Sequence, residues 1–153
     1  MKRILLCLVF VLSLFLNSCK TTPKDTGVIG KFKVSDKYNL KFIGYNSDIM
    51  NPNQDKRCYY KIYIDKVEDG RTTTGLESQE KVYETKLSQN RHLMVVEKWI
   101  LDEKAGKYVK LNNIDQPKPN FVYFTIPEKR IVIIKMETDE DGKSKFEIDF
   151  ERE

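Results

Sequence analysis

The fold is decided by residues 130–150, which read RIVIIKMETDEDGKSKFEIDF. Near the end of this stretch, Phe146, Ile148 and Phe150 alternate with charged residues, so apolar and charged side chains fall on opposite faces of an extended strand. An Asp-Gly pair supplies the turn between this strand and the β-branched run before it. The stretch therefore predicts an antiparallel hairpin. Its two strands cover residues 130–138 and 145–150.

Seven further runs are rich in β-branched and aromatic residues and are separated by turn residues. They cover residues 29–34, 38–45, 59–67, 81–87, 92–101, 108–111 and 121–126. With the hairpin, about nine strands are expected. The segment from residue 28 to residue 153 is long enough for one packed core. We therefore predict a single all-β domain over residues 28–153.

Short connections at 102–107, 127–129 and 139–143 each join two of these predicted strands. Successive tight connections favour an antiparallel meander, which closes most naturally into a small barrel, and a β-sandwich is the alternative. Residues 131–134 are apolar on both faces of their strand. That strand is therefore expected to be central, or to border a second apolar surface such as a barrel interior or a partner site. Three irregular segments are expected to be loops: 46–57, 68–79 and 112–120.

The N-terminus has the pattern of a secretory signal. Two cations after Met1 precede a mostly apolar run at residues 4–16, which is shorter than the roughly 20 apolar residues of a membrane span. A small residue, Ser18, closes the signal. We therefore expect the protein to be exported and residues 1–18 to be removed.

The junction Leu16-Asn17-Ser18 followed by Cys19 resembles the lipobox of bacterial lipoproteins. Because of Asn17, the resemblance is to the looser motifs of spirochaete or Bacteroidetes lipoproteins. It implies that a lipoprotein-specific signal peptidase recognises Leu16, Asn17 and Ser18. It also implies that Cys19 receives a thioether-linked diacylglycerol and usually a third acyl chain, which together hold a protein on a bilayer. The alternative is an ordinary secretory signal in which Cys19 falls by chance.

The same resemblance implies a location in the bacterial cell envelope, with the membrane as a partner through the lipid on Cys19. Lys20 stands where an enterobacterial signal for retention in the inner membrane has Asp. The outer membrane, at its periplasmic face or at the cell surface, is therefore the expected location. Residues 19–27 are expected to form the lipidated N-terminus and a polar tether. The eight residues 20–27 would span about 26 to 29 Å when extended, which keeps the domain near the bilayer.

Charge and cysteine usage exclude several classes of protein. Removal of the signal lowers the formal net charge from +4 to +2, and cations and anions are interspersed, which does not fit a nucleic-acid-binding surface. Of the three cysteines, Cys7 lies within the signal and Cys19 is the lipidation site, which leaves Cys58. No intrachain disulfide is therefore expected. Cys58 begins an aromatic run and is expected to be a small buried hydrophobe.

Residues that catalysis requires are scarce. His92 is the only histidine, and at the start of a predicted strand it is expected to be exposed or capping rather than catalytic. The sequence has no glycine-flanked serine, phosphate-binding glycine loop or Cys-x-x-Cys pair. The Asp-Glu-Asp-Gly run at 139–142 lacks the carboxylate that a calcium loop needs, because Ile148 occupies that position. We therefore expect no enzymatic activity, no cofactor and no bound metal.

The strand predicted over 59–67 suggests a contact surface. Its even-numbered apolar residues, from Tyr60 to Ile64, are expected to face the core. Tyr59 and Tyr63 would then form an exposed aromatic pair beside Lys61, a candidate contact patch. The function expected is a non-enzymatic protein-binding or structural module of the envelope, with a protein partner of unknown identity. The alternatives are a lipocalin-like carrier of a small apolar ligand and, third, an enzyme of unknown type.

The lipidation of Cys19 is testable directly. The variant Cys19→Ala is expected to lose incorporation of labelled palmitate and to leave the membrane fraction, because the thiol is the atom that receives the lipid. Labelling and fractionation of cells that produce either form measure both effects. A variant that still takes up the label would contradict the assignment.

Overall fold

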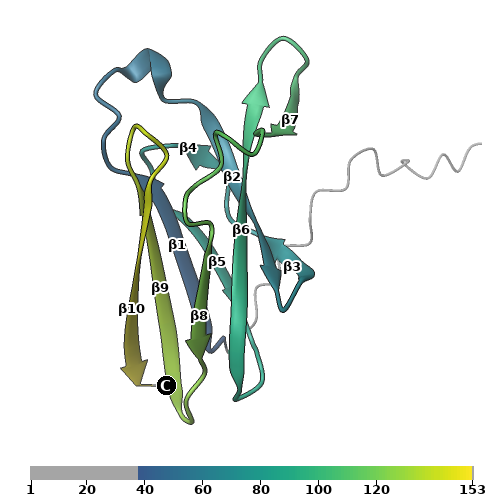
Figure 1. The fold of residues 1–153 in the computed structure, drawn as a ribbon, viewed down its shortest axis with the longest axis vertical. Helices are drawn as coiled ribbons and strands as arrows, with labels where there is room; N and C mark the ends of the chain where they lie inside the picture. Colours follow the sequence, from purple (N-terminus) through teal and green to yellow (C-terminus); the bar gives the residue numbers. More distant parts are fainter. Residues whose placement is uncertain (1–37, 153) are drawn as a thin grey trace, which may run out of the picture.

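The computed structural model describes residues 38–152, and this part of the chain is almost entirely β-structure (Figure 1). Ten strands and one short 3-10 helix, Pro52–Gln54, follow one another along it. The strands are β1 Leu40–Asn46, β2 Arg57–Ile64, β3 Val67–Arg71, β4 Gly75–Leu76, β5 Lys81–Thr85, β6 Arg91–Asp102, β7 Lys107–Lys110, β8 Phe121–Thr125, β9 Arg130–Thr138 and β10 Ser144–Arg152. The predicted strand at 29–34, the signal, Cys19 and the tether lie outside the described residues.

The strands form two sheets. The four-stranded sheet has the order β10-β9-β1-β5, and the six-stranded sheet has the order β3-β2-β6-β7, with β4 paired to β2 and β8 paired to β6. Every pair is antiparallel except β1 and β9, which run parallel. Side chains from both sheets share one hydrophobic core, so the sheets pack face to face as a sandwich. The all-β prediction with antiparallel sheets is confirmed.

The favoured barrel is not found among the described residues, and the reason lies in one connection. The segments 102–107 and 139–143 close the β6–β7 and β9–β10 hairpins, as predicted. Residues 127–129 do not close a hairpin, because β8 pairs with β6 in one sheet and β9 pairs with β1 and β10 in the other. The chain therefore crosses between the sheets at this turn. The meander is interrupted there, and the sandwich alternative describes the architecture.

The prediction of one strand over 59–67 and a loop over 68–79 is wrong in part. The strand β2 ends at Ile64, and Asp65 and Lys66 form a two-residue turn in which both have positive φ, 50° and 73°. Positive φ at both central residues is the geometry of a type I′ hairpin turn. The chain therefore folds back as β3, which pairs with β2. Neither residue is glycine, so the turn carried no strong signal in the sequence.

The core is organised around Tyr60, which is fully buried. Its ring forms an edge-to-face contact with the ring of Phe42, which belongs to the other sheet. The two ring centroids are 6.1 Å apart and the ring planes are at 85°. The Tyr60 ring also lies on Gly44, where a Cβ would come within 2.7 Å of a ring carbon. Gly44 therefore leaves the space that the ring occupies. The other buried members are Leu40, Ile62, Ile64, Tyr83, Met94, Val96, Phe124, Ile126, Val132, Ile134 and Met136.

A core substitution tests the sandwich. Ile134 is 0% exposed at the centre of β9, so Ile134→Ala is expected to lower the free energy of unfolding by about 2 to 5 kcal/mol through lost burial and a residual cavity. The matched variant Ile114→Ala removes the same atoms from a side chain that is 78% exposed, and a change within about 0.5 kcal/mol is expected. Urea denaturation followed by fluorescence measures both. Equal effects would contradict the assignment of the core.

Candidate functional site

Six aromatic side chains lie on the outer face of the six-stranded sheet. Cross-strand pairing places Tyr59 beside Trp99, and Leu101 beside Tyr108. Tyr63 lies beside Val95, which in turn faces Phe121, and Leu93 faces Tyr123. All belong to the face opposite the core residues Met94 and Val96. We call this surface the aromatic face; its members are Tyr59, Tyr63, Trp99, Tyr108, Phe121 and Tyr123.

One half of the aromatic face is tightly packed. The rings of Tyr59 and Trp99 are stacked, with centroids 6.0 Å apart and planes at 9°, and Tyr108 lies 5.0 Å from Tyr59. The guanidinium carbon of Arg71 lies 4.9 Å from the Tyr59 centroid, and Lys61 Nζ lies 4.7 Å from that of Trp99. These contacts combine aromatic stacking with cation–π attraction. They hold these rings in fixed positions relative to one another.

The sequence placed Tyr59 and Tyr63 on one outward face, and the structure agrees. The prediction that Tyr59 is exposed is wrong. Tyr59 is 7% exposed, because Trp99, Tyr108 and Arg71 cover its ring. This burial raises the pKa of the Tyr59 hydroxyl, partly offset by Arg71. Lys61, the third member of the predicted patch, covers Trp99 and pairs with Glu68 at 3.2 Å. Whether the patch binds a partner stays a prediction.

Tyr63 anchors an ion-pair network between β2, β6 and β7. Its hydroxyl donates to Glu97 Oε2 at 3.1 Å, and Lys110 Nζ lies 2.5 Å from Glu97 Oε1. Partial burial and the neighbouring Glu97 carboxylate raise the pKa of Tyr63 to about 12. Burial acts to raise the pKa of Glu97, but Lys110 and Tyr63 outweigh it and hold that pKa below its ordinary value. At neutral pH the network is a carboxylate held by a phenol and an ammonium group.

The other half of the aromatic face is open to solvent. Phe121 is 47% exposed and Tyr123 is 53% exposed, and their rings meet edge to face at 6.2 Å. The guanidinium carbon of Arg91 lies 4.9 Å from the Tyr123 centroid. Exposed aromatic rings beside arginine are the composition typical of protein-binding surfaces. The sequence did not predict this half. Phe121 and Tyr123 of β8 lie on the same face as Tyr63 of β2 only because both strands pair with β6 in a particular register.

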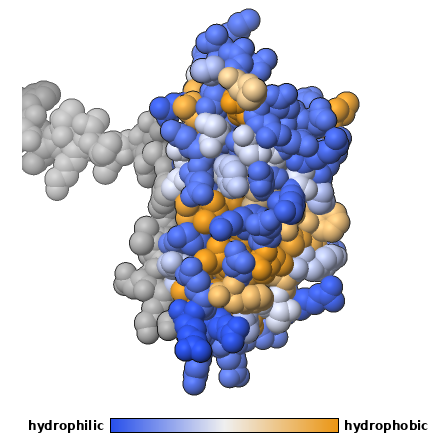
Figure 2. All heavy atoms as spheres, turned by 90° about the vertical axis from the view of Figure 1, so that its left-hand side faces the viewer, coloured by the Kyte–Doolittle hydropathy of each residue, from blue (hydrophilic) through white to orange (hydrophobic). Residues whose placement is uncertain are grey.

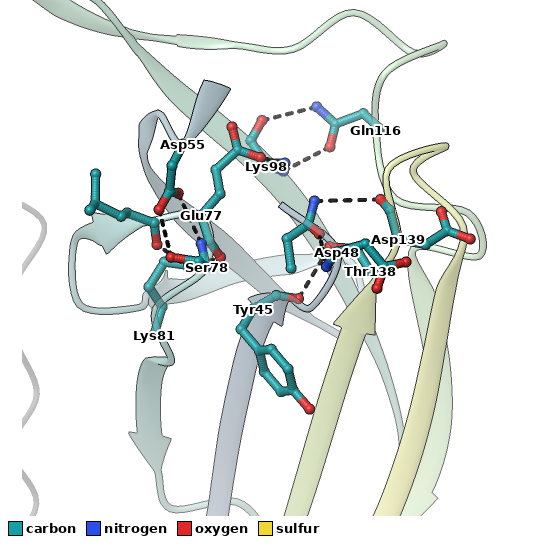
Figure 3. A network of polar contacts seen from close by, with 12 residues as sticks. Tyr45, Asp48, Asp55, Glu77, Ser78, Lys81, Lys98, Gln116, Thr138 and Asp139 are labelled. Carbon is teal, nitrogen blue, oxygen red and sulfur yellow. Dashed lines mark hydrogen bonds and ion pairs between the residues drawn. The ribbon is translucent and has the colours of Figure 1, made fainter. Parts of the chain in front are cut away.

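A second feature, at the loop end of the sandwich, is a polar cleft of about 450 Å³. Figure 3 shows the network of polar contacts at this end of the molecule. Glu77 and Lys98 pair with each other in its wall and are 7% and 8% exposed. Gln116 receives the Lys98 backbone N–H at 2.7 Å and donates back to the Lys98 carbonyl at 3.0 Å. Lys81 Nζ donates to backbone carbonyls of Leu76, Glu77 and Gln79 at 2.7, 2.9 and 2.5 Å. These charged groups are engaged with one another and with backbone, so they hold the loops in place.

His92 lies at the start of β6, where an exposed or capping histidine is predicted. The side chain is not exposed: it is 7% exposed, with Nδ1 2.7 Å from Asp65 Oδ2 and Nε2 3.0 Å from the Ser88 carbonyl. Asp65 also accepts the Leu93 backbone N–H at 2.9 Å. Both carboxylate oxygens of Asp65 are thus used to tie the β2–β3 turn to β6.

Cys58 is fully buried and unpaired, as expected for a small hydrophobe, and burial raises the pKa of its thiol to about 11. Within residues 38–152, no three His, Cys, Asp or Glu side chains are arranged to hold a metal ion. In the same part of the chain, no helix has the length and apolar character needed to cross a membrane.

Comparison of the sequence and structure with protein-family models, curated proteins and solved structures found no match.

The His92–Asp65 contact predicts a pH-dependent stability. Burial acts to lower the pKa of His92, but Asp65 and the Ser88 carbonyl outweigh it and raise that pKa, while the Leu93 N–H and His92 lower the pKa of Asp65. Because the pKa of His92 is raised in the folded protein, the protonated ring stabilises the fold fully below its unfolded pKa of about 6.5. This stabilisation is lost as the pH rises through the pKa of His92 in the folded state. Because the pKa of Asp65 is lowered in the folded protein, its carboxylate stabilises the fold fully above its unfolded pKa of about 3.9. This stabilisation is lost as the pH falls through the pKa of Asp65 in the folded state.

The difference in the free energy of unfolding between the wild-type protein and Asp65→Asn is therefore expected to be largest between about pH 4 and pH 6.5. It is expected to shrink above about pH 6.5. Asparagine tolerates the positive φ of residue 65, so the turn is kept. Denaturation across this pH range, with the His92 ring titrated by NMR, measures both effects. A pH-independent difference would show that the contact has no ionic character.

Proposed function

We propose that this protein is a membrane-anchored bacterial envelope lipoprotein that binds another protein through its aromatic face. The observation that supports the proposal most strongly is the gathering of six aromatic rings on the outward side of one sheet, with Phe121 and Tyr123 about half exposed. The outer face of an antiparallel sheet is ordinarily polar. Exposed rings on such a face lose water contact favourably when a partner covers them.

The charges around the rings indicate the chemistry of the partner. Four cations border or cover the rings: Lys61, Arg71, Arg91 and Lys110. Of these, Arg91 lies in the open half, against Tyr123. Its guanidinium has donors that suit a carboxylate in bidentate geometry. We therefore expect the partner surface to present apolar side chains together with an acidic residue near Arg91.

The anchor limits where such a partner can be. If lipid is attached at Cys19, the chain between Cys19 and Tyr38 cannot span more than roughly 65 Å even when fully extended. The aromatic face would therefore work within a domain's width or two of the membrane. A partner that is itself in or on the same membrane fits this reach. The outer membrane remains the expected location.

The filled interior favours a binding surface over a carrier. A lipocalin-like carrier needs an apolar cavity large enough for its ligand. Here Tyr60 and Phe42 meet between the sheets, and buried side chains of both sheets contact one another. The cleft at the loop end is lined by charged groups such as Glu77, Lys98 and Asp139. The surface, rather than the interior, therefore offers the apolar contact area.

The proposal is tested by photocrosslinking in cells that produce the protein. A photoreactive residue is placed at Tyr123, in the open half of the aromatic face, or at Met50, which is 88% exposed in the loop after β1. A discrete crosslinked protein is expected from position 123 and not from position 50. Its yield is expected to fall about tenfold when Arg91→Ala is added, a loss of about 1.4 kcal/mol, as for removal of a charged interface contact.

Phe121→Ala is expected to weaken the same crosslink without altering the thermal unfolding of the domain, because Phe121 is half exposed at an end strand. Ile114→Ala is the control, since Ile114 is a large apolar side chain that is 78% exposed in the segment between β7 and β8 and belongs to neither proposed binding surface. A crosslinking pattern that is the same at positions 123 and 50, or one that both substitutions weaken equally, would argue against the aromatic face.

A further inference from the structure

The end strand β10 differs from the other strand edges of the molecule. It pairs with β9 in unbroken register over nine residues, from Ser144 to Arg152, and no other described strand lies on its far side. In Figure 1 this edge runs down the left side of the domain. Alternate residues of such a strand direct N–H and C=O groups away from the sheet, so about four residues offer unpaired backbone groups to an incoming strand.

Three other edges within residues 38–152, those of β3, β5 and β7, are protected in the ways usual for soluble proteins. The strand β3 is interrupted by a register shift opposite Ile62 and Tyr63, and β7 has four residues. The edge of β5 is partly covered by Thr73, which donates its N–H to the Val82 carbonyl at 2.9 Å. By contrast β10 has no proline, bulge or charge among its inward residues up to Phe150. Natural sheets shorten, cover or blunt a long regular edge, and in β10 the blunting charges up to Phe150 lie on the outward face only.

The core is also incompletely closed beside this edge. The inward residues Phe146 and Ile148 of β10 are partly buried, and Phe150 is 51% exposed. Across the sandwich, β8 is an end strand too, and its inward Val122 is partly buried. Figure 2, which views the domain from the side of β10, shows apolar surface among hydrophilic side chains. An additional strand on β10 would place its inward side chains over this row of residues.

The two end strands are fixed relative to each other at one end. Lys118 donates its N–H to the Gly142 carbonyl at 2.9 Å and accepts the Ser144 N–H at 2.9 Å. Beyond this parallel bridge, β8 joins β6 and β10 joins β9, so the strands enter different sheets. The open side of the sandwich is therefore bridged at one end.

The outward residues of β10 specify the charge of an incoming strand. They are Lys145, Glu147, Asp149 and Glu151, three carboxylates and one amine. Glu147 forms an exposed ion pair with Lys145 at 2.7 Å, and Asp149 lies 3.9 Å from Lys135 of β9, so the outward side chains of β10 keep an excess of negative charge. In an adjacent strand, residues directly across face these side chains, and opposite charges there are favourable. A second copy of β10 in antiparallel pairing centred on Ile148 would set Glu147 against Asp149, which is repulsive, and Lys145 against Glu151, which is favourable. A strand with basic residues at these positions would instead face three carboxylates, so basic residues are favoured.

We propose that the β10 edge binds an extended segment of a partner protein in which apolar residues alternate with lysine or arginine. The apolar residues cover Phe146, Ile148 and Phe150, and the basic residues lie beside Glu147 and Asp149. Backbone pairing supplies affinity and the alternating side chains supply selectivity, as in other strand-addition complexes. This surface is separate from the aromatic face and goes beyond the function proposed above.

The test uses the purified full-length protein and two nine-residue peptides, one alternating valine with lysine and one alternating valine with glutamate. Peptide titration with amide hydrogen exchange read by NMR measures affinity and locates the protected residues. The lysine peptide is expected to bind about tenfold more tightly than the glutamate peptide and to slow exchange along β10. Absence of binding, or equal binding of both peptides, would overturn the proposal.

Matched variants separate strand addition from general charge attraction. The double variant Glu147→Lys, Asp149→Lys is expected to reverse the peptide preference. The control Glu80→Lys, Glu103→Lys makes the same change in net charge at exposed positions away from β10, before β5 and in the β6–β7 turn, and is expected to keep the original preference. Tyr123→Ala is expected to leave peptide binding unchanged, so failure of the aromatic face and failure of this edge are distinguishable. Slow exchange along β10 without peptide would mean that a second copy or this chain's own segment covers the edge, and the proposal would be wrong.

Discussion

The contact of Tyr60 with Phe42 and Gly44 is the constraint on which the rest of the structure depends. It joins the two sheets at the centre of the core, and any side chain at residue 44 would collide with the ring. Because neighbouring residues of a strand point to opposite faces, an inward Tyr60 forces the odd-numbered residues Tyr59, Lys61 and Tyr63 outward. The same packing that fills the interior therefore also creates the aromatic face.

Buried polar groups are the second requirement of this small core. Lys81 is fully buried, and its ammonium group is satisfied by three backbone carbonyls, while burial lowers its pKa. Lys98 and Glu77 pair with each other, and Gln116 binds the backbone of Lys98 on both its N–H and its carbonyl. A buried charge that lost its partner would cost several kcal/mol, so these contacts hold the loop end to the sheets. These contacts therefore stabilise the scaffold and lie away from the aromatic face.

Much of the fold could be predicted from local pattern, and the rest depended on information that pattern lacks. Alternation at Phe146, Ile148 and Phe150 identified β10, and the apolar run of β9 indicated a central strand. The crossing at 127–129 could not be read, because a short turn looks the same whether its strands share a sheet or not. The aromatic face was predicted at Tyr59 and Tyr63 but not at Tyr123, since joining them needs the register of β6. The lipid anchor stays a prediction from the N-terminal motif.

The central claim, that the aromatic face is covered by a protein partner at the membrane, is tested most directly by hydroxyl-radical footprinting of the protein in intact cells and after purification. Phe121 and Tyr123 are expected to be oxidised readily in the purified protein and to be protected in cells. Met50, the most exposed of the large apolar side chains, is expected to react equally in both. Equal oxidation of Phe121 and Tyr123 in cells and in solution would contradict the account.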